Sequence, residues 1–145
     1  MSADLSTRSV WPYAVAAIVS LIGLGDSIYL TIEHVTGQSV RCTVIAGCSE
    51  VLGSSYAVLA GIPLAAVGAA AYFGVFSLAT LAAFGYRQAG ALLAILVAIM
   101  FLMTLWLLYL QAFVIHHFCQ FCLLSALVTL VLTGLVVVQR RLRAA

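Results

Sequence analysis

The chain has very little charge. Only 7% of its 145 residues are charged, and it contains no lysine and no asparagine. With 66% hydrophobic residues and a mean hydropathy of +1.24, this composition excludes an ordinary soluble domain. The net charge of +2 comes from six scattered arginines set against four acidic residues, and nothing in this pattern indicates a nucleic-acid partner. We therefore expect a protein that resides in the lipid bilayer.

Long apolar runs predict the architecture. A helix needs about 20 residues to cross about 30 Å of hydrocarbon, and four runs reach that length, at about 11–31, 61–84, 89–113 and 118–138. The only substantial polar connection is an outer loop at 33–55. The sequence thus predicts an all-α polytopic protein, a four-transmembrane-helix bundle that forms one membrane domain over residues 1–145. A short interfacial helix is expected after Cys48.

A Cys-x-x-Cys pair, Cys119 and Cys122, lies where the fourth apolar run begins. Two thiols three residues apart on a first helical turn face the same way and can close a small disulfide ring. The free N–H groups and the positive dipole end of the helix favour a thiolate, the form that attacks disulfides and electrophiles. We interpret this turn as redox-active. Buried small hydrophobes, a structural disulfide and half of a zinc site are the alternatives.

A second pair, Cys42 and Cys48, lies in the polar loop. Four cysteines allow three pairings, and the sequence does not choose among them. Two purely structural disulfides would add little stability, because closing a small loop removes little conformational entropy from the unfolded chain. A relay uses both pairs better: thiol–disulfide exchange would carry electrons from the loop to a lipid-soluble oxidant held by the apolar spans. A zinc site with His116 and His117 is the chemical rival, although the spacing is not a standard zinc signature, and we expect no metal.

The arginines predict the orientation. With four spans, both termini share a side with the turn at 86–88, and that side carries five of the six arginines: Arg8, Arg87, Arg140, Arg141 and Arg143. By the positive-inside rule this side is cytoplasmic. We expect a multi-pass protein of the cell membrane, with both cysteine pairs on the outer face, where disulfides form and persist.

Asp26 is the one carboxylate inside an expected span. An ionised carboxylate there costs a few kcal/mol on insertion scales, so it should face the bundle or the outer interface. Two interpretations stay open: a proton acceptor, or a polar group satisfied near the membrane edge.

Several motifs resemble the bacterial and archaeal homologues of vitamin K epoxide reductase. They are Gly23-Leu24-x-x-Ser27-x-Tyr29-Leu30-Thr31, Cys42-x5-Cys48-Ser49-Glu50-Val51-Leu52-x-Ser54-Ser55-Tyr56-Ala57, Gly61-Ile62-Pro63 and Cys119-x-x-Cys122. Together they cover most of residues 11–138, and the block from Cys48 to Pro63 is the most specific. The resemblance implies a four-helix bundle around a quinone of the menaquinone or ubiquinone type.

The resemblance also implies roles for single residues. Cys122 would meet the quinone, Cys119 would exchange with Cys48, and a separate thioredoxin-like protein would attack Cys42. We expect Ser54 to support the loop that carries Cys48, through a hydrogen bond to the backbone. The residues expected at the quinone are Cys122, Phe121, Ile115, Gln111 and Pro63. Vertebrate members hold the quinone with an Asn and a Tyr, whereas this chain lacks Asn and has Ala126 four residues after Cys122; this favours quinone reduction over epoxide reduction.

Two other functions compete with this one. The disulfide-bond formation protein B family has similar chemistry, but it carries its Cys-x-x-Cys in the first outward loop, whereas here the motif begins the fourth span. A non-enzymatic membrane subunit with structural or metal-binding cysteines is the alternative of a different class. Thiol counts before and after addition of quinone would separate it from an oxidoreductase, because structural disulfides should not respond.

Overall fold

The computed structural model describes residues 2–36, 58–59, 61–116 and 120–144. Within these residues the long helices are α1 (Ser2–Val35), α3 (Leu64–Ala83), α4 (Arg87–Tyr109) and α5 (Gln120–Ala144). A π-helical turn, η2 (Leu110–Ile115), continues α4. Two short antiparallel strands, β1 (Val58–Leu59) and β2 (Ile62–Pro63), pair Val58 with Pro63 before α3 begins. The predicted all-α polytopic fold is confirmed, and the interfacial helix expected after Cys48 lies outside the described residues.

All four long helices carry a segment apolar and long enough to cross a membrane. In the described part of the chain these segments are Val10–Val35, Leu64–Ala83, Arg87–Ile115 and Gln120–Leu142. The protein is therefore a multi-pass membrane protein. Helices α1 and α5 extend further than the apolar runs indicated, because polar residues at the two ends of the chain continue them.

The start of α3 follows from its proline. Pro63 is the N-cap residue, with φ −57°, and its missing N–H costs nothing at a position where no intrahelical bond would form. Gly61, with φ +83°, makes the turn between β1 and β2, a conformation that a residue without a Cβ adopts readily. The helix therefore begins at Leu64, three residues later than the predicted boundary.

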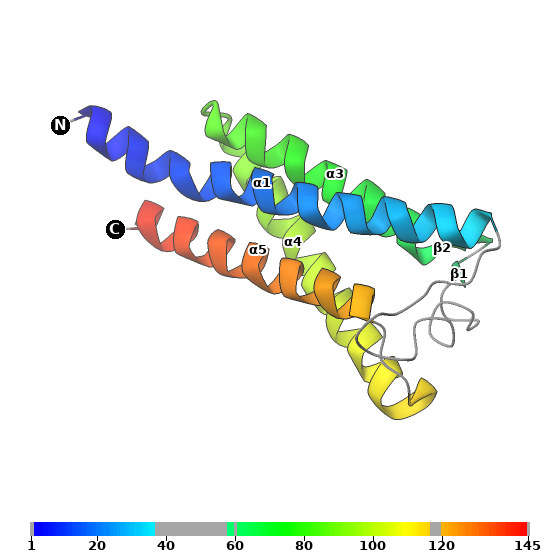
Figure 1. Ribbon diagram of the computed structural model, residues 1–145. Helices are drawn as coiled ribbons and strands as arrows, with labels where there is room; N and C mark the ends of the chain where they lie inside the picture. Colours follow the sequence, from blue (N-terminus) through cyan, green and yellow to red (C-terminus); the bar gives the residue numbers. More distant parts are fainter. Residues whose placement is uncertain (1, 37–57, 60, 117–119, 145) are drawn as a thin grey trace.

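The helices form a ring in which α1 packs against α3 and α5, and α4 packs against the same two helices (Figure 1). Small side chains fill much of the core: Ala16, Ala79, Ala82 and Ala89 are buried beside Tyr72, Leu93 and Leu132. Such residues allow helices to approach closely in lipid. Large apolar side chains such as Ile18, Phe73, Leu102 and Trp106 point outward, where the hydrocarbon of a bilayer would cover them.

Both termini lie at one end of the bundle, and the first turn of α5 lies towards the other end (Figure 1). The exposed residues Arg87, Arg140 and Arg141 belong to the end that holds the termini. The bundle is thus polarised along its axis, with positive charge at the terminal end and the Cys122 turn at the opposite end.

Candidate active site

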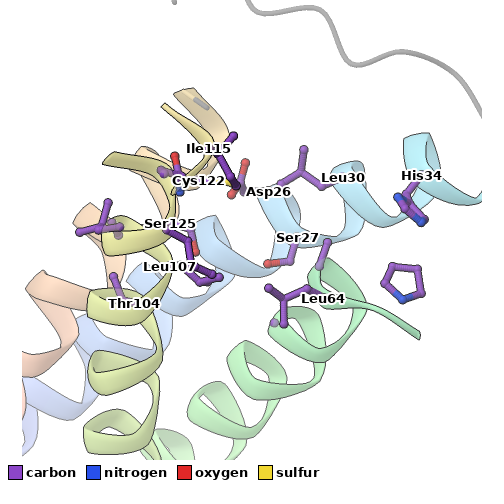
Figure 2. A pocket seen from close by; sticks show the side chains of 17 residues that line it. Asp26, Ser27, Leu30, His34, Leu64, Thr104, Leu107, Ile115, Cys122 and Ser125 are labelled. Carbon is purple, nitrogen blue, oxygen red and sulfur yellow. The ribbon is translucent and has the colours of Figure 1, made fainter. Parts of the chain in front are cut away.

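A cavity lies among the long helices where α1 and α4 end and where α3 and α5 begin (Figure 2). Its volume is about 140 Å³, close to the roughly 150 Å³ of an engineered apolar cavity in another protein that binds benzene. It can therefore hold one six-membered ring. Most of the lining is aliphatic, and the polar lining residues are Asp26, Ser27, His34, Thr104, Gln111, Cys122 and Ser125.

Cys122 is the third residue of α5, and its half-buried side chain lines this cavity. The backbone N–H groups of a first helical turn have no intrahelical acceptor, so they stabilise negative charge. The start of α5 thus provides a setting that stabilises negative charge beside Cys122. Cys122 combines that electrostatic setting with direct access to a space of ring size.

Asp26 lines the same cavity from α1. It is only 9% exposed, and its Oδ2 atom is completely buried without a hydrogen-bond partner in the described structure. Its neighbour Ser27 is also buried, at the point where α3 comes close: a Cβ on Gly68 would lie 3.3 Å from Ser27 Oγ. Close packing of α1 on α3 thus holds a carboxylate inside the bundle, facing the cavity.

Gln111 reaches the cavity from η2, where the helix adds one residue to its turn. The side chain is 3% exposed. Single π-helical turns inside membrane or soluble helices occur frequently at functional sites, because they shift the direction of the side chains that follow. Three residues of this turn, Leu110, Gln111 and Ile115, line the cavity wall. After it, His116 ends the helix in the left-handed conformation, with φ +61°.

A buried hydrogen-bond cluster fixes α5 just beyond Cys122. The Tyr72 hydroxyl of α3 lies 2.5 Å from Ser125 Oγ, 3.0 Å from the Ser125 carbonyl oxygen and 3.2 Å from Thr129 Oγ1. Against the Tyr72 ring lies Gly23 of α1, where a Cβ would overlap ring atoms. Three helices therefore meet at Tyr72, and they set the rotation of α5 one turn after the cysteine.

Residues 14–137 match the model of the vitamin K epoxide reductase family. The chain belongs to this family. It is a membrane thiol–disulfide oxidoreductase, and the match favours this family over the disulfide-bond formation protein B family. The family is linked to quinones in general.

Four of the five residues predicted to contact the quinone line the cavity, and one does not. Cys122, Ile115, Gln111 and Pro63 all line the cavity. Phe121 is not among the lining residues; its ring packs on Tyr29 of α1, with the ring centroids 5.3 Å apart. That contact closes α5 against α1 beside the cavity. The other predicted site residues, Cys42, Cys48, Cys119 and Ser54, lie outside the described residues, as does most of the alternative zinc site.

The sequence analysis did not single out His34, Ser125 or Tyr72, although a feature of the sequence pointed to each of them. His34 lies eight residues after Asp26, a spacing that returns to the same helix face. Ser125 lies three residues after Cys122 and so shares its face. Tyr72 is a phenol inside an apolar run, and a buried phenol needs a hydrogen-bond partner. The identity of that partner, 53 residues away, had no local signal.

Proposed function

We propose that this protein passes electrons from a separate thioredoxin-like dithiol protein to a membrane quinone of the menaquinone or ubiquinone type. The thioredoxin-like partner reduces the disulfide of Cys42 and Cys48, Cys48 exchanges with Cys119, and Cys122 delivers the electrons to the quinone. Disulfide formation in the partner outside the cytoplasm is the result. Each exchange proceeds through a mixed disulfide.

The observation that carries the proposal is the position of Cys122 on the wall of a ring-sized, mainly aliphatic cavity. Pockets for small apolar ligands combine such a lining with a few polar groups that orient the ligand. Gln111 supplies amide N–H donors at the wall, and a donor can bind a quinone carbonyl oxygen. An oxidisable thiol at a helix N-terminus then faces the ring that takes up its electrons.

Ala126 favours quinone rather than epoxide as the substrate. It lines the cavity one turn after Cys122, at the position where vertebrate members use a tyrosine hydroxyl. An alanine offers no group that could hold or protonate an epoxide oxygen. We therefore propose that turnover ends with quinone reduction.

We further propose that the termini are cytoplasmic and that the cysteines face outward. The charged end of the bundle, with Arg87, Arg140 and Arg141, supports this orientation through the positive-inside rule. The opposite end would then lie in an oxidising compartment, where disulfide exchange with a secreted partner is possible.

The test is quinone reduction by the purified protein supplied with a reduced thioredoxin-like donor. Ala126→Leu adds a branched side chain to the cavity wall, and we expect it to raise the KM for a short-chain quinone about tenfold, the effect of roughly 1.4 kcal/mol of overpacking. Leu127→Ala is the matched control, because Leu127 is exposed on the outer face of α5. Equal KM values for Ala126→Leu and wild type would remove the cavity as the quinone site.

A further inference from the structure

The cavity contains one acidic group that the electron path does not use. Asp26 is the only carboxylate among the lining residues that the structure describes. A carboxylate in the membrane interior is expensive, and such residues usually mark ion or proton pathways. Its Oδ2 atom is buried and has no hydrogen-bond partner among the described residues, so the carboxylate has an acceptor that the described structure does not use.

Three other polar lining groups are less suited to moving a proton. The Ser125 hydroxyl is engaged with Tyr72, and Thr104 donates to the Met100 carbonyl oxygen at 2.8 Å. His34 lies two helical turns from Asp26, about 12 Å along the axis of α1, and Figure 2 shows it on the far side of the view from Cys122. Asp26 and Cys122 both line the cavity, and they are the carboxylate and the thiol among its described lining residues.

We infer that Asp26 accepts the proton of the Cys122 thiol and hands it to an oxygen of the bound quinone. This inference rests on the proposed function. It adds to the electron path a proton path through a residue of the first helix, which belongs to neither cysteine pair. A positioned side chain that transfers a proton in the rate-limiting step typically contributes about 100-fold or more.

The step balances. Oxidation of the Cys119 and Cys122 thiols breaks two S–H bonds, forms one S–S bond and releases two electrons and two protons. The quinone takes up both electrons and both protons and becomes a quinol. Asp26 holds the Cys122 proton between thiol and quinone oxygen, the Cys119 thiol supplies the second proton, and the carboxylate ends the cycle in its starting state.

The surroundings of Asp26 define what a pH titration would report. The titratable groups near it are His34 on α1, Tyr72 on α3 and Cys122 on α5. The lining residues contributed by α4 and η2, among those described, carry no titratable side chain. Replacing Asp26 by asparagine therefore removes one proton-binding group and leaves the other three in place.

The experiment uses the full chain in lipid nanodiscs, with dithiothreitol as donor and a short-chain ubiquinone as acceptor. We expect Asp26→Asn to lower kcat about 100-fold, to leave the KM for the quinone near the wild-type value, and to change the pH profile of kcat. Asp26→Glu should restore a pH-dependent kcat. Glu33→Gln is the matched control, a carboxylate-to-amide change on the same helix outside the cavity, and should behave as wild type.

The thermal stability of the Asp26→Asn variant distinguishes a carboxylate that carries protons from one that only supports the fold. Since Oδ2 has no partner to lose within the described structure, Asp26→Asn should keep or raise the Tm while activity falls. Unchanged kcat and an unchanged pH profile in Asp26→Asn would overturn the inference, and so would parallel losses of Tm and activity. A wild-type protein that fails to reduce quinone with dithiothreitol would instead contradict the proposed function.

Infrared difference spectra keep the inference testable if the asparagine variant does not fold. Quinone reduction by the wild-type protein should produce a transient band of a protonated carboxyl group, and Glu33→Gln should retain it. If no carboxyl band changes during turnover in either protein, Asp26 does not carry the proton.

Discussion

The hydroxyl of Tyr72 lies 2.5 Å from Ser125 Oγ, which places the anchor between α3 and α5 one helical turn after Cys122. The same hydroxyl also meets the Ser125 carbonyl oxygen and Thr129 Oγ1. The position of the turn that carries Cys122 is thus set by a contact between helices within the bundle.

Tyr72→Phe tests the anchor. Loss of the hydroxyl should lower the free energy of unfolding in detergent by about 1 kcal/mol, the usual net value of such a hydrogen bond. It should also lower the rate of quinone reduction several-fold, because α5 would be held less firmly. Tyr86→Phe is the control, since Tyr86 is exposed at the turn between α3 and α4. Wild-type stability and turnover in Tyr72→Phe would mean that the cluster does not position Cys122.

Gly23 and Gly25 form a matched pair on α1. A Cβ on Gly23 would overlap the Tyr72 ring, whereas a Cβ on Gly25 would meet nothing within 4 Å. We expect Gly23→Ala to destabilise the protein by about 1–3 kcal/mol through overpacking. Gly25→Ala should be neutral or slightly stabilising, because alanine favours the helix. Thermal unfolding of the two variants side by side gives the comparison, and equal Tm values would show that α1 can move away from Tyr72 at no cost.

The cysteine variants test the order of electron transfer. Cys42→Ala should block reduction by the protein partner and leave quinone reduction by a small dithiol largely intact. Cys122→Ala should abolish quinone reduction and let a disulfide between Cys48 and Cys119 accumulate, detectable by mass spectrometry after alkylation. If Cys119→Ala were inactive with a small dithiol while Cys122→Ala still reduced quinone, the roles of these two thiols would have to be exchanged.

Thiol labelling tests the orientation. In intact cells a membrane-impermeant maleimide should react with reduced Cys42, and a cysteine introduced beside Arg140 should stay unlabelled until the membrane is opened. This expectation follows from the positive charge at the terminal end of the bundle. The reverse pattern of labelling would invert the topology.

The sequence predicted the helices well and their ends less well. Apolar runs identify spans because the bilayer demands them, and Pro63 marked the start of α3 to within a few residues. The π-helical turn η2 was not foreseen, since Leu110–Ile115 is as apolar as the residues before it. Its geometry depends on how α4 packs on its neighbours, and no local pattern encodes that.

The candidate site was also predictable only in part. The spacing of Cys119 and Cys122 indicated a redox-active turn, the family resemblance implied the role of Cys122, and Asp26 stood out as a charge within a span. The cavity could not be predicted from the sequence, because its wall combines residues from the ends of α1 and α4 with residues from the starts of α3 and α5. The placement of Phe121 against Tyr29, rather than on the cavity wall, likewise depends on the rotation of α5, which the distant Tyr72 fixes.

The unequal lengths of the apolar segments have a mechanical consequence. Arg87–Ile115 spans 29 residues and Leu64–Ala83 spans 20, so the first would be about 43 Å long and the second about 30 Å at 1.5 Å per residue. A segment longer than the hydrocarbon layer tilts to stay within it, and the degree of tilt depends on bilayer thickness. Because the far end of this segment carries Gln111 and Ile115 at the cavity wall, lipids with longer or shorter acyl chains should open or narrow the space beside Cys122. The membrane would then set how readily a quinone enters.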